Sequence, residues 1–177
     1  FELIIVDNGS TDGSRKAITE HMKSRTKSSL KVTLIKLSRN WGFTGGINAA
    51  YKARDRRSKY IAIVNNDAIP KPDYLRTLVT FLERRKDVGV AQGIVVKLGE
   101  SSIIDSAGFF VNEALYLFSP FKGKPSRSLR NPLFVSYVEG TMPVYKLDAV
   151  RSVMGDDDTM YITSGFVFYL EDVFLSL

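Results

Sequence analysis

The stretch YIAIVNNDAIPKPDYL, residues 60–75, predicts a buried strand that ends in polar residues and leads into a helix. Ile61 to Val64 is apolar at every position, which is typical of a strand of a parallel sheet covered on both faces by helices. Asn65, Asn66 and Asp67 follow directly. Burying such groups costs free energy unless each finds a partner or a cation. The stretch therefore indicates either a cation site or an Asx turn that starts the proline-containing loop.

The same strand-then-helix order repeats through the first half of the chain. Predicted strands are FELIIVD, KVTLIKLS, YIAIVNND and VGVAQGIVV, and predicted helices cover about 12–23, INAAYKARD and 73–86. Asp73 stands at the start of the third helix, where its carboxylate can accept hydrogen bonds from free amide groups. This β-α-β-α-β-α-β series predicts an α/β fold with a mostly parallel sheet flanked by helices.

The second half has a less regular pattern. After about Lys97, short strand-like pieces are separated by a basic loop at 122–132, and LDAVRSVM indicates a short helix. The length of 177 residues and the hydrophobic content of 44% are typical of one domain with a sizeable core. Because residue 1 lies inside a predicted strand and the chain stops in EDVFLSL, we expect an excerpt of a longer protein.

The composition limits the chemistry. The chain has no cysteine, which excludes disulfides, thiolate metal sites and a cysteine nucleophile and fits a reducing compartment. No apolar run reaches the roughly 18 residues of a membrane span, and the first residues lack signal-peptide features, so we expect a soluble, cytoplasmic chain.

The formal charge of +6 is concentrated in basic clusters at 54–59, 84–86 and 122–130. Such clusters are usually solvated faces. They also suit a partner that bears phosphate, either a nucleotide or an anionic lipid surface. The clusters lack interleaved aromatic residues, and no nucleic-acid motif accompanies them, which disfavours nucleic acid as the partner.

A second polar strand end is VDNGSTDGS, residues 6–14. Asp7 can accept hydrogen bonds from a base N–H or a ribose hydroxyl, and Ser10, Thr11 or Asp12 can cap the next helix. Taken alone, this stretch favours an ordinary strand-to-helix turn.

A third polar strand end is SRNWGFTGGINAA, residues 38–50. Gly42, Gly45 and Gly46 permit the backbone to approach a ligand before a helix whose amides attract anions. The stretch is neither a P-loop nor a dinucleotide fingerprint. Ligands of open α/β sheets bind outside the carboxyl ends of the strands, so we expect the three polar strand ends to lie along one edge.

An acidic pair, Glu171 and Asp172, follows an apolar-aromatic run near the end of the chain. Adjacent carboxylates in such a setting are expected to have separated pKa values, which suits a general base. Taken alone, the pair is more simply explained as the start of a helix, where the helix dipole favours negative charge.

The order of these motifs resembles that of the family 2 glycosyltransferases, most closely the rhamnosyltransferase-like branch. The matching segments run from VDNGSTDGS through NWGFTGGINAA, NNDAIPKPDYL, IIDSAGFFVN and VEGTMPVYKLDAVRSVMG to FYLEDVFL. The resemblance implies one GT-A domain over residues 1–177 that lacks its first strand and its C-terminal part. Residues 1–97 would form the nucleotide-sugar-binding half and residues 98–177 the acceptor and catalytic-base half.

The resemblance also implies an activity. This is an inverting, metal-dependent transfer of a sugar, of hexosyl- or rhamnosyltransferase type, from a nucleoside-diphosphate donor to a hydroxyl of a glycan or lipid-linked acceptor. Such a reaction serves polysaccharide biosynthesis in the cell envelope, and the basic clusters suit peripheral association with the inner face of the membrane.

The resemblance assigns roles to individual residues. Asp172 is expected to be the base with Glu171 tuning it, and Asp67 the ligand of Mg²⁺ or Mn²⁺. The residues expected to bind the donor are Asp7, Asn8, Ser10, Asn40, Gly42, Gly45, Gly46, Asn48 and Asn66.

Two alternatives remain open. A catalytically impaired nucleotide-sugar-binding or regulatory domain fits the missing strand, Asn66 where the metal motif often has a carboxylate, and Phe174 where an acidic residue is common. An unrelated nucleotide-binding α/β enzyme, such as a nucleotidyltransferase or a reductase, is disfavoured because the P-loop and the dinucleotide fingerprint are absent.

Overall fold

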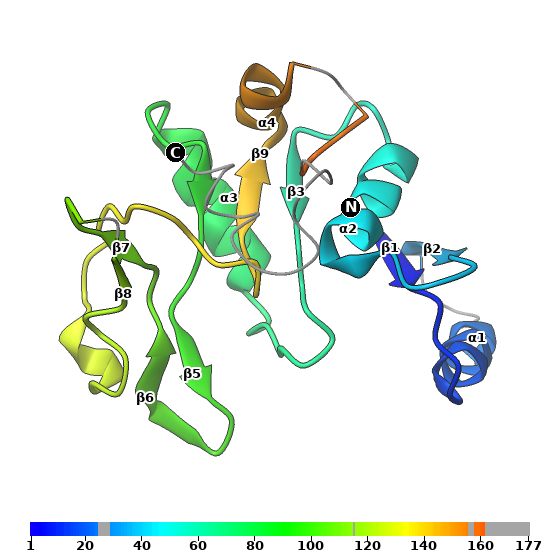
Figure 1. Cartoon of the computed structure of the whole chain (residues 1–177), viewed down its shortest axis with the longest axis horizontal. Helices are drawn as coiled ribbons and strands as arrows, with labels where there is room; N and C mark the ends of the chain where they lie inside the picture. Colours follow the sequence, from blue (N-terminus) through cyan, green and yellow to red (C-terminus); the bar gives the residue numbers. More distant parts are fainter. Residues whose placement is uncertain (25–28, 115, 156–157, 162–177) are drawn as a thin grey trace. The chain divides into compact units, whose positions relative to one another are not determined.

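The computed structural model describes residues 1–24, 29–114, 116–155 and 158–161. They form two compact units, which are described separately (Figure 1). The first unit contains residues 1–58 together with the described residues from 154 onward, and the second contains residues 59–153. No helix among the described residues is long and apolar enough to cross a membrane.

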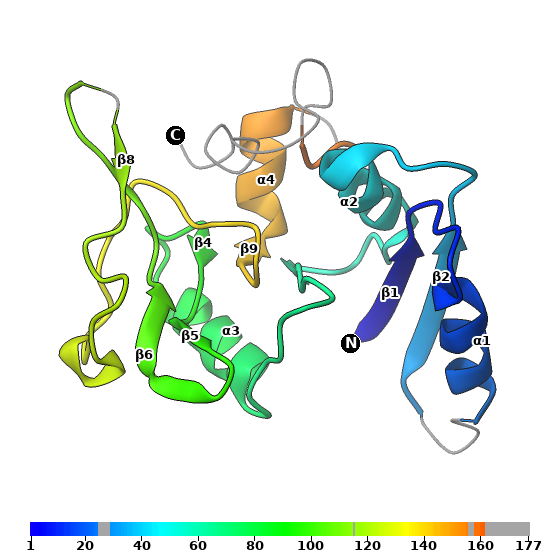
Figure 2. The ribbon, with the colours of Figure 1, turned by 60° about the horizontal axis from the view of Figure 1, so that its bottom comes forward.

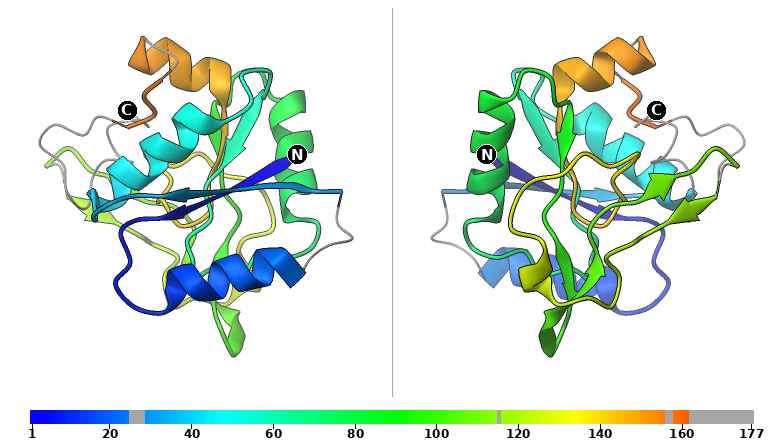
Figure 3. Two further views of the ribbon diagram at one scale, coloured as in Figure 1. Left: turned by 90° about the vertical axis from the view of Figure 1, so that its right-hand side faces the viewer. Right: turned by 90° about the vertical axis from the view of Figure 1, so that its left-hand side faces the viewer.

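The first unit is built on two parallel strands with a helix on each face. Strand β1 (Glu2–Asp7) pairs with β2 (Lys31–Lys36) in register from Glu2↔Lys31 to Asp7↔Lys36. Figure 3 shows α1 (Ser14–Ser24) and α2 (Gly42–Ala53) on opposite faces of this pair. Because consecutive strands run in the same direction, both carboxyl ends meet at one edge, where Leu37 N–H donates to Asp7 O (2.9 Å).

Helix α2 begins five residues before the predicted INAAYKARD segment. The prediction of a glycine-rich loop before this helix is therefore wrong. Gly42, Gly45 and Gly46 belong to the first turns of the helix. Asn40 Oδ1 accepts the Gly42 N–H (2.8 Å), which satisfies one of the free donors at the helix start. Gly45 leaves space for Trp41, because a Cβ there would lie 2.6 Å from the Trp41 Cβ. Tertiary contacts thus outweigh the low helix propensity of glycine.

The second unit contains a three-stranded sheet in the order β3-β9-β4. The outer strands β3 (Tyr60–Ala62) and β4 (Val90–Ala91) both pair antiparallel with β9 (Val144–Lys146). The sequence pattern predicts mainly parallel pairing and does not reveal that a segment from the irregular second half lies between β3 and β4. Helix α4 (Leu147–Met154) follows β9 directly.

Helix α3 (Tyr74–Arg84) covers this sheet with its predicted apolar face. Leu82 is fully buried against Ala91 and Val144, and Leu75, Leu78 and Val79 pack against the same cluster. The predicted carboxylate cap is wrong: Asp73 makes no capping bond through its side chain, and its backbone C=O accepts the Thr77 N–H (2.9 Å). Its φ of −95° and ψ of 1° differ from the extended conformation that a capping side chain requires.

The predicted strand VGVAQGIVV is interrupted after β4. Gly93 turns the chain toward Tyr74: its N–H donates to Tyr74 Oη (3.2 Å), and a Cβ at Gly93 would lie 2.8 Å from Tyr74 Cε2. The chain then forms the hairpin of β5 (Val95–Lys97) and β6 (Glu100–Ser106) (Figure 2). A second hairpin joins β7 (Phe110–Val111) to β8 (Leu117–Phe118), and a short 3-10 helix covers Ser126–Ser128.

Candidate active site

Asp7 ends strand β1 with a fully buried carboxylate. Its Oδ1 accepts the Ser10 N–H (3.1 Å), and its Oδ2 accepts the Arg15 Nε–H (2.5 Å). Hydrogen bonds from Ser10 and then from Arg15 lower the pKa of Asp7, although burial acts in the opposite direction. The carboxylate is therefore held in its ionised form at the end of the strand, where an acceptor for a nucleoside is predicted.

Arg15 is a site residue that the sequence reasoning missed. It lies in the first turn of α1, and besides binding Asp7 it donates from Nη2 to Leu37 O (3.2 Å), just after β2. One guanidinium thus links α1 to the ends of both strands. Since both oxygens of Asp7 already accept hydrogen bonds from the protein, the expected contact with a nucleoside must share or replace one of them.

The lowered pKa of Asp7 predicts a pH-dependent stability. A carboxylate whose folded-state pKa lies below its usual value of 3.8 stabilises the fold above about pH 4, and this contribution is lost as the pH falls through the folded-state pKa. We expect wild type to exceed Asp7→Asn in free energy of unfolding at pH 7 and the gap to shrink by pH 2. Urea unfolding at both pH values measures the gap. The exposed Glu113→Gln serves as the control, and a gap of equal size at both pH values would contradict the assignment.

The side-chain amides of Asn8 and Asn40 form hydrogen bonds that hold the segment between β2 and α2 in place. Asn8 Nδ2 donates to Asn40 Oδ1 (3.0 Å) and to Gly42 O (2.8 Å), while Asn8 Oδ1 accepts the Trp41 N–H (3.0 Å). These bonds hold the start of α2 beside the end of β1. The two amides, which are predicted to contact the donor, therefore also have a positioning role.

Trp41 and Arg39 form an exposed aromatic and cationic pair beside this connection. The Arg39 guanidinium carbon lies 3.8 Å from the centroid of the Trp41 ring, and Trp41 is 52% exposed. The sequence reasoning singled out neither side chain. An exposed tryptophan next to a polar strand end is the signal that could have identified the pair.

The backbone at Gly9 lies so close to the backbone at Arg39 that only glycine fits at position 9. Its φ is +75°, and a Cβ there would lie 2.3 Å from the backbone carbon of Arg39. We expect Gly9→Ala to lower the free energy of unfolding by about 3 kcal/mol or more, from backbone strain plus overlap. Gly13→Ala is the control for added volume: nothing lies within 4 Å of its Cβ position, but Gly13 precedes α1 as its N-cap, so we expect a loss of about 1 kcal/mol or less. Equal stability of the two variants in urea unfolding would contradict this reasoning.

Asn48 is engaged with the chain beyond α4. Its Oδ1 accepts the N–H groups of Met160 and Tyr161 (2.9 Å each), and its Nδ2 donates to Tyr161 O (2.7 Å). Met160 and Tyr161 are both buried. Asn48 thus holds residues 160–161 on α2, and its contact with the donor stays a prediction.

Asn66 and Asp67 lie in a turn after β3, in the second unit. Asn65 N–H donates to Thr141 O (3.0 Å), and Ala68 N–H donates back to Asn65 O (3.1 Å), which closes the turn. The expected burial of this polar end is wrong for Asn66 and Asp67, which are both exposed. The turn places them in its two central positions, so solvent rather than protein satisfies their side chains.

The residues around Asp67 offer a limited metal site. Asp67 makes no hydrogen bond or ion pair with any described residue, and no group of three or more acidic or histidine side chains suited to a metal is found in the described part of the chain. Mg²⁺ commonly takes one or two protein carboxylates and completes its octahedron with water and substrate phosphates. A single free carboxylate therefore fits a cation that arrives with a diphosphate.

Glu171 and Asp172 lie outside the described residues. Asp7 belongs to the first unit and Asp67 to the second. The meeting of these three sites in one cleft stays a prediction.

The three arginines of the basic cluster at 54–59 make contacts within the first unit. Arg54 is buried, with its guanidinium 3.6 Å from the Tyr51 ring centroid and Nη1 donating to Tyr51 O (2.6 Å). Arg57 pairs with Asp55 (2.7 Å), and Arg56 pairs with Asp158. The expected solvated cationic face is therefore wrong for Arg54.

The chain has the GT-A fold. Two solved structures share this fold. One is the mannosyltransferase PcManGT from Pyrobaculum calidifontis in complex with GDP-Man and Mn²⁺, with a TM-score of 0.61 and 18% identity over 97% of this chain and 40% of that chain. The other is TarS from S. aureus, with a TM-score of 0.55 and 16% identity over 98% of this chain and 44% of that one.

The chain belongs to glycosyl transferase family 2, whose sequence pattern matches residues 1–153. Among curated relatives, the dolichyl-phosphate beta-glucosyltransferase of Dictyostelium discoideum is 25% identical over 123 residues, which are 68% of this chain and 36% of the relative. An uncharacterized glycosyltransferase of Nostoc sp. is 30% identical over 107 residues, 60% of this chain and 31% of the relative. The chain thus spans about a third of the length of these relatives. The predicted family and fold class are confirmed.

Proposed function

We propose that this chain is the donor-binding and catalytic part of an inverting glycosyltransferase of hexosyl or rhamnosyl type. It would move a sugar from a nucleoside-diphosphate donor to a hydroxyl of a glycan or lipid-linked acceptor. The observation that carries the proposal is Asp7, a buried carboxylate whose pKa is lowered at the carboxyl edge of β1 and β2. Two similar proteins support the proposed donor and acceptor classes. The structure of one contains GDP-Man and Mn²⁺, which supports a nucleoside-diphosphate donor, and the name of the other contains dolichyl phosphate, which supports a lipid-linked acceptor.

In the proposed reaction, Asp7 accepts a hydrogen bond from a base N–H or a ribose hydroxyl. Ser10 and the first turns of α2, with Gly42, Gly45 and Gly46, border the same edge, where the positive end of the helix dipole favours the negative diphosphate. Asn8 and Asn40 keep that turn in place before the donor binds. The donor site is thus expected to be largely preformed in the first unit.

Asp67 would hold Mg²⁺ or Mn²⁺, with Asn66 beside it contacting ribose or a metal-bound water. When bound, such a cation supplies positive charge to the departing diphosphate. Asp172 takes the proton from the acceptor hydroxyl as its oxygen attacks the anomeric carbon, and Glu171 tunes the pKa of that base. The bond to the diphosphate breaks on the opposite face, which inverts the configuration.

A binding or regulatory domain is the second candidate. It is favoured by the engagement of Asn8, Asn40 and Asn48 with the protein and by Asn66 in place of a carboxylate. Both candidates are expected to bind the donor, but only the glycosyltransferase is expected to transfer its sugar.

Trp41 provides the direct experiment, because it is the only tryptophan of the chain and lies beside Asn8. We expect UDP, GDP or dTDP with Mn²⁺ to change its fluorescence in a saturable way, and the matching nucleotide sugar to be hydrolysed or transferred. Binding without turnover, by a longer protein that contains this chain, would favour the regulatory domain. If calorimetry and fluorescence detect no nucleotide binding, the proposed function is wrong.

A further inference from the structure

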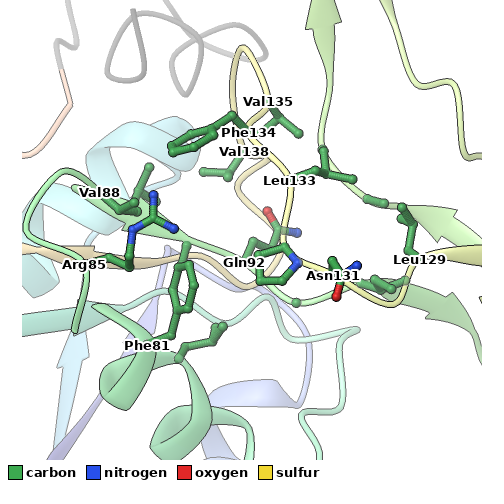
Figure 4. Close-up of a pocket in the computed structure, with 18 of the residues that line it drawn as sticks. Phe81, Arg85, Val88, Gln92, Leu129, Asn131, Leu133, Phe134, Val135 and Val138 are labelled. Carbon is green, nitrogen blue, oxygen red and sulfur yellow. The ribbon is translucent and has the colours of Figure 1, made fainter. Parts of the chain in front are cut away.

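A cavity of about 510 Å³ lies within the second unit, between the outer edge of β4 and the segment 129–138 (Figure 4). Its lining is mainly apolar, with Leu78 and Phe81 from α3 on one side and Leu133 and Val138 from the segment on the other. Cavities of roughly 300–1,000 Å³ are the size that binds ligands in proteins. None of the residues assigned to the donor or to catalysis lines it.

The far wall of this cavity is held by contacts of its own. Ser136 N–H donates to Phe109 O (2.9 Å), and the rings of Phe109 and Tyr137 stack with centroids 5.0 Å apart. Val135 packs so closely on Gly108 that a Cβ there would lie 2.7 Å from Val135 Cγ1. The segment 129–138 is thus anchored on residues 108–109, which leaves a preformed groove beside β4.

Gln92 places an unpartnered amide in this groove. Its Nε2 and Oε1 are both buried, and neither has a hydrogen-bond partner among the described residues. Figure 4 shows Gln92 between Phe81 of α3 and Arg85, which follows that helix, on one side and the far-wall side chain Leu133 on the other. A buried donor or acceptor that makes no hydrogen bond costs free energy. The side-chain amide of Gln92 carries a donor beside an acceptor, which matches the acceptor and donor of a peptide group.

The outer edge of β4 has backbone groups that can pair with a peptide. Lys146 N–H donates to Gly89 O (2.8 Å), so the residue pair 89↔146 is a hydrogen-bonded pair of the antiparallel β4–β9 ladder. Hydrogen-bonded and non-bonded pairs alternate in such a ladder, so Val90, opposite Tyr145, directs its N–H and C=O away from β9. In the described residues β4 is the outer strand of its sheet. Val90 therefore directs its backbone hydrogen-bonding groups to the edge of the groove, and the buried Gln92 amide lies in the groove wall.

The charged residues that line the groove are two arginines and one aspartate, Arg85, Arg130 and Asp87. Arg85 pairs with Asp87 (2.6 Å) and lies 5.9 Å and 5.3 Å from the ring centroids of Phe81 and Phe134. Arg130 is exposed, and no described carboxylate forms an ion pair with it. Two cations against one carboxylate favour an anionic group on whatever enters.

We propose that this groove binds an extended, apolar peptide segment with one acidic residue, supplied by a partner protein and added as a strand to β4. Val90 pairs with the peptide backbone, Gln92 satisfies one of its peptide groups, and an apolar side chain fills the cavity. Arg130 faces the acidic residue. Strand addition of this kind draws affinity from main-chain hydrogen bonds and specificity from pockets for alternate side chains.

The test titrates the ¹⁵N-labelled chain with the blocked peptide acetyl-LVEL-amide. We expect saturable shifts of the Val90 N–H and the Gln92 side-chain amide. The same peptide N-methylated at its valine cannot donate to Val90 O and is expected to bind about tenfold more weakly. Replacing its glutamate by lysine is expected to weaken binding about threefold.

Gln92→Leu keeps the volume and removes the amide, so we expect about tenfold weaker peptide binding and a higher unfolding midpoint without peptide. The exposed Ser101→Leu is the matched control and should leave the affinity unchanged. Loss of stability in Gln92→Leu would show that its amide already has partners and would overturn the proposal. Equal binding of the methylated peptide, or no binding of the parent peptide at millimolar concentration, would also overturn it. Displacement of the peptide by decanoate with no shift at Val90 would reveal a lipid-type site and overturn strand addition.

Discussion

Replacing Asp172 with asparagine is expected to lower the rate of sugar transfer by about 10²- to 10⁴-fold, the usual contribution of a positioned general base. The amide has nearly the shape of the carboxylate but cannot take the proton of the acceptor hydroxyl. Donor binding should therefore change little. Transfer assays with a longer protein that contains this chain measure the rate, and Trp41 fluorescence or calorimetry measures donor affinity.

Glu171→Gln is the matched control for that experiment. It removes the neighbouring carboxylate while leaving Asp172 in place, so we expect a smaller loss of rate and a shift of the pH–rate profile, because the charge next to the base has changed. Transfer by Asp172→Asn at the wild-type rate would remove Asp172 from its proposed role. A loss of donor affinity equal to the loss of rate would indicate a binding role instead.

Replacing Asp67 with alanine is expected to weaken Mn²⁺-dependent binding of a nucleoside diphosphate about tenfold or more, or about 1.4 kcal/mol. The structure supplies the reason: Asp67 is exposed in a turn and makes no hydrogen bond or ion pair with the described residues, so its carboxylate is free to bind a cation. Calorimetry with and without chelator measures the effect.

Asn66→Asp is the companion variant, because it adds a second carboxylate to the same turn. We expect it to bind Mn²⁺ with the nucleotide more tightly than wild type, since one or two carboxylates suit such a cation. Chelator should reduce wild type to the level of Asp67→Ala and leave that variant unchanged. Equal nucleotide affinity in wild type, Asp67→Ala and chelator would show that the single-carboxylate site is wrong.

Patterns within short windows predicted much of the fold. The apolar runs became β1, β2 and a β3 that is shorter than predicted, because it ends at Ala62 and leaves Val64 exposed. The face of α3 that carries Leu78 and Leu82 is the one packed on the sheet. These predictions succeed because side-chain periodicity directly reflects which face of a helix or strand is buried. The predicted strand around Gln92 failed because Tyr74, nineteen residues away, turns the chain at Gly93.

The candidate site was predicted less completely. Asp7 was identified because a carboxylate after an apolar strand is unusual, yet nothing local indicated that Arg15 would bind it. The contact of Asn8, Asn40 and Asn48 with the donor stays a prediction, and the sequence did not reveal their hydrogen-bond partners, which come from other segments. The burial expected for Asn66 and Asp67 was wrong because a backbone turn, closed through Thr141 and Ala68, exposes them.

The sequence by itself determined the family, the α/β class and the order of strand-end motifs, since these depend on residue type and spacing along the chain. Only the tertiary structure decided which amides are engaged by the protein, which carboxylate is buried with its arginine and which is free. It alone placed residues 144–146 as a strand between β3 and β4. The physical reason is that a hydrogen bond or a buried charge depends on partners far away in sequence, such as Asn48 and Tyr161, which are 113 residues apart.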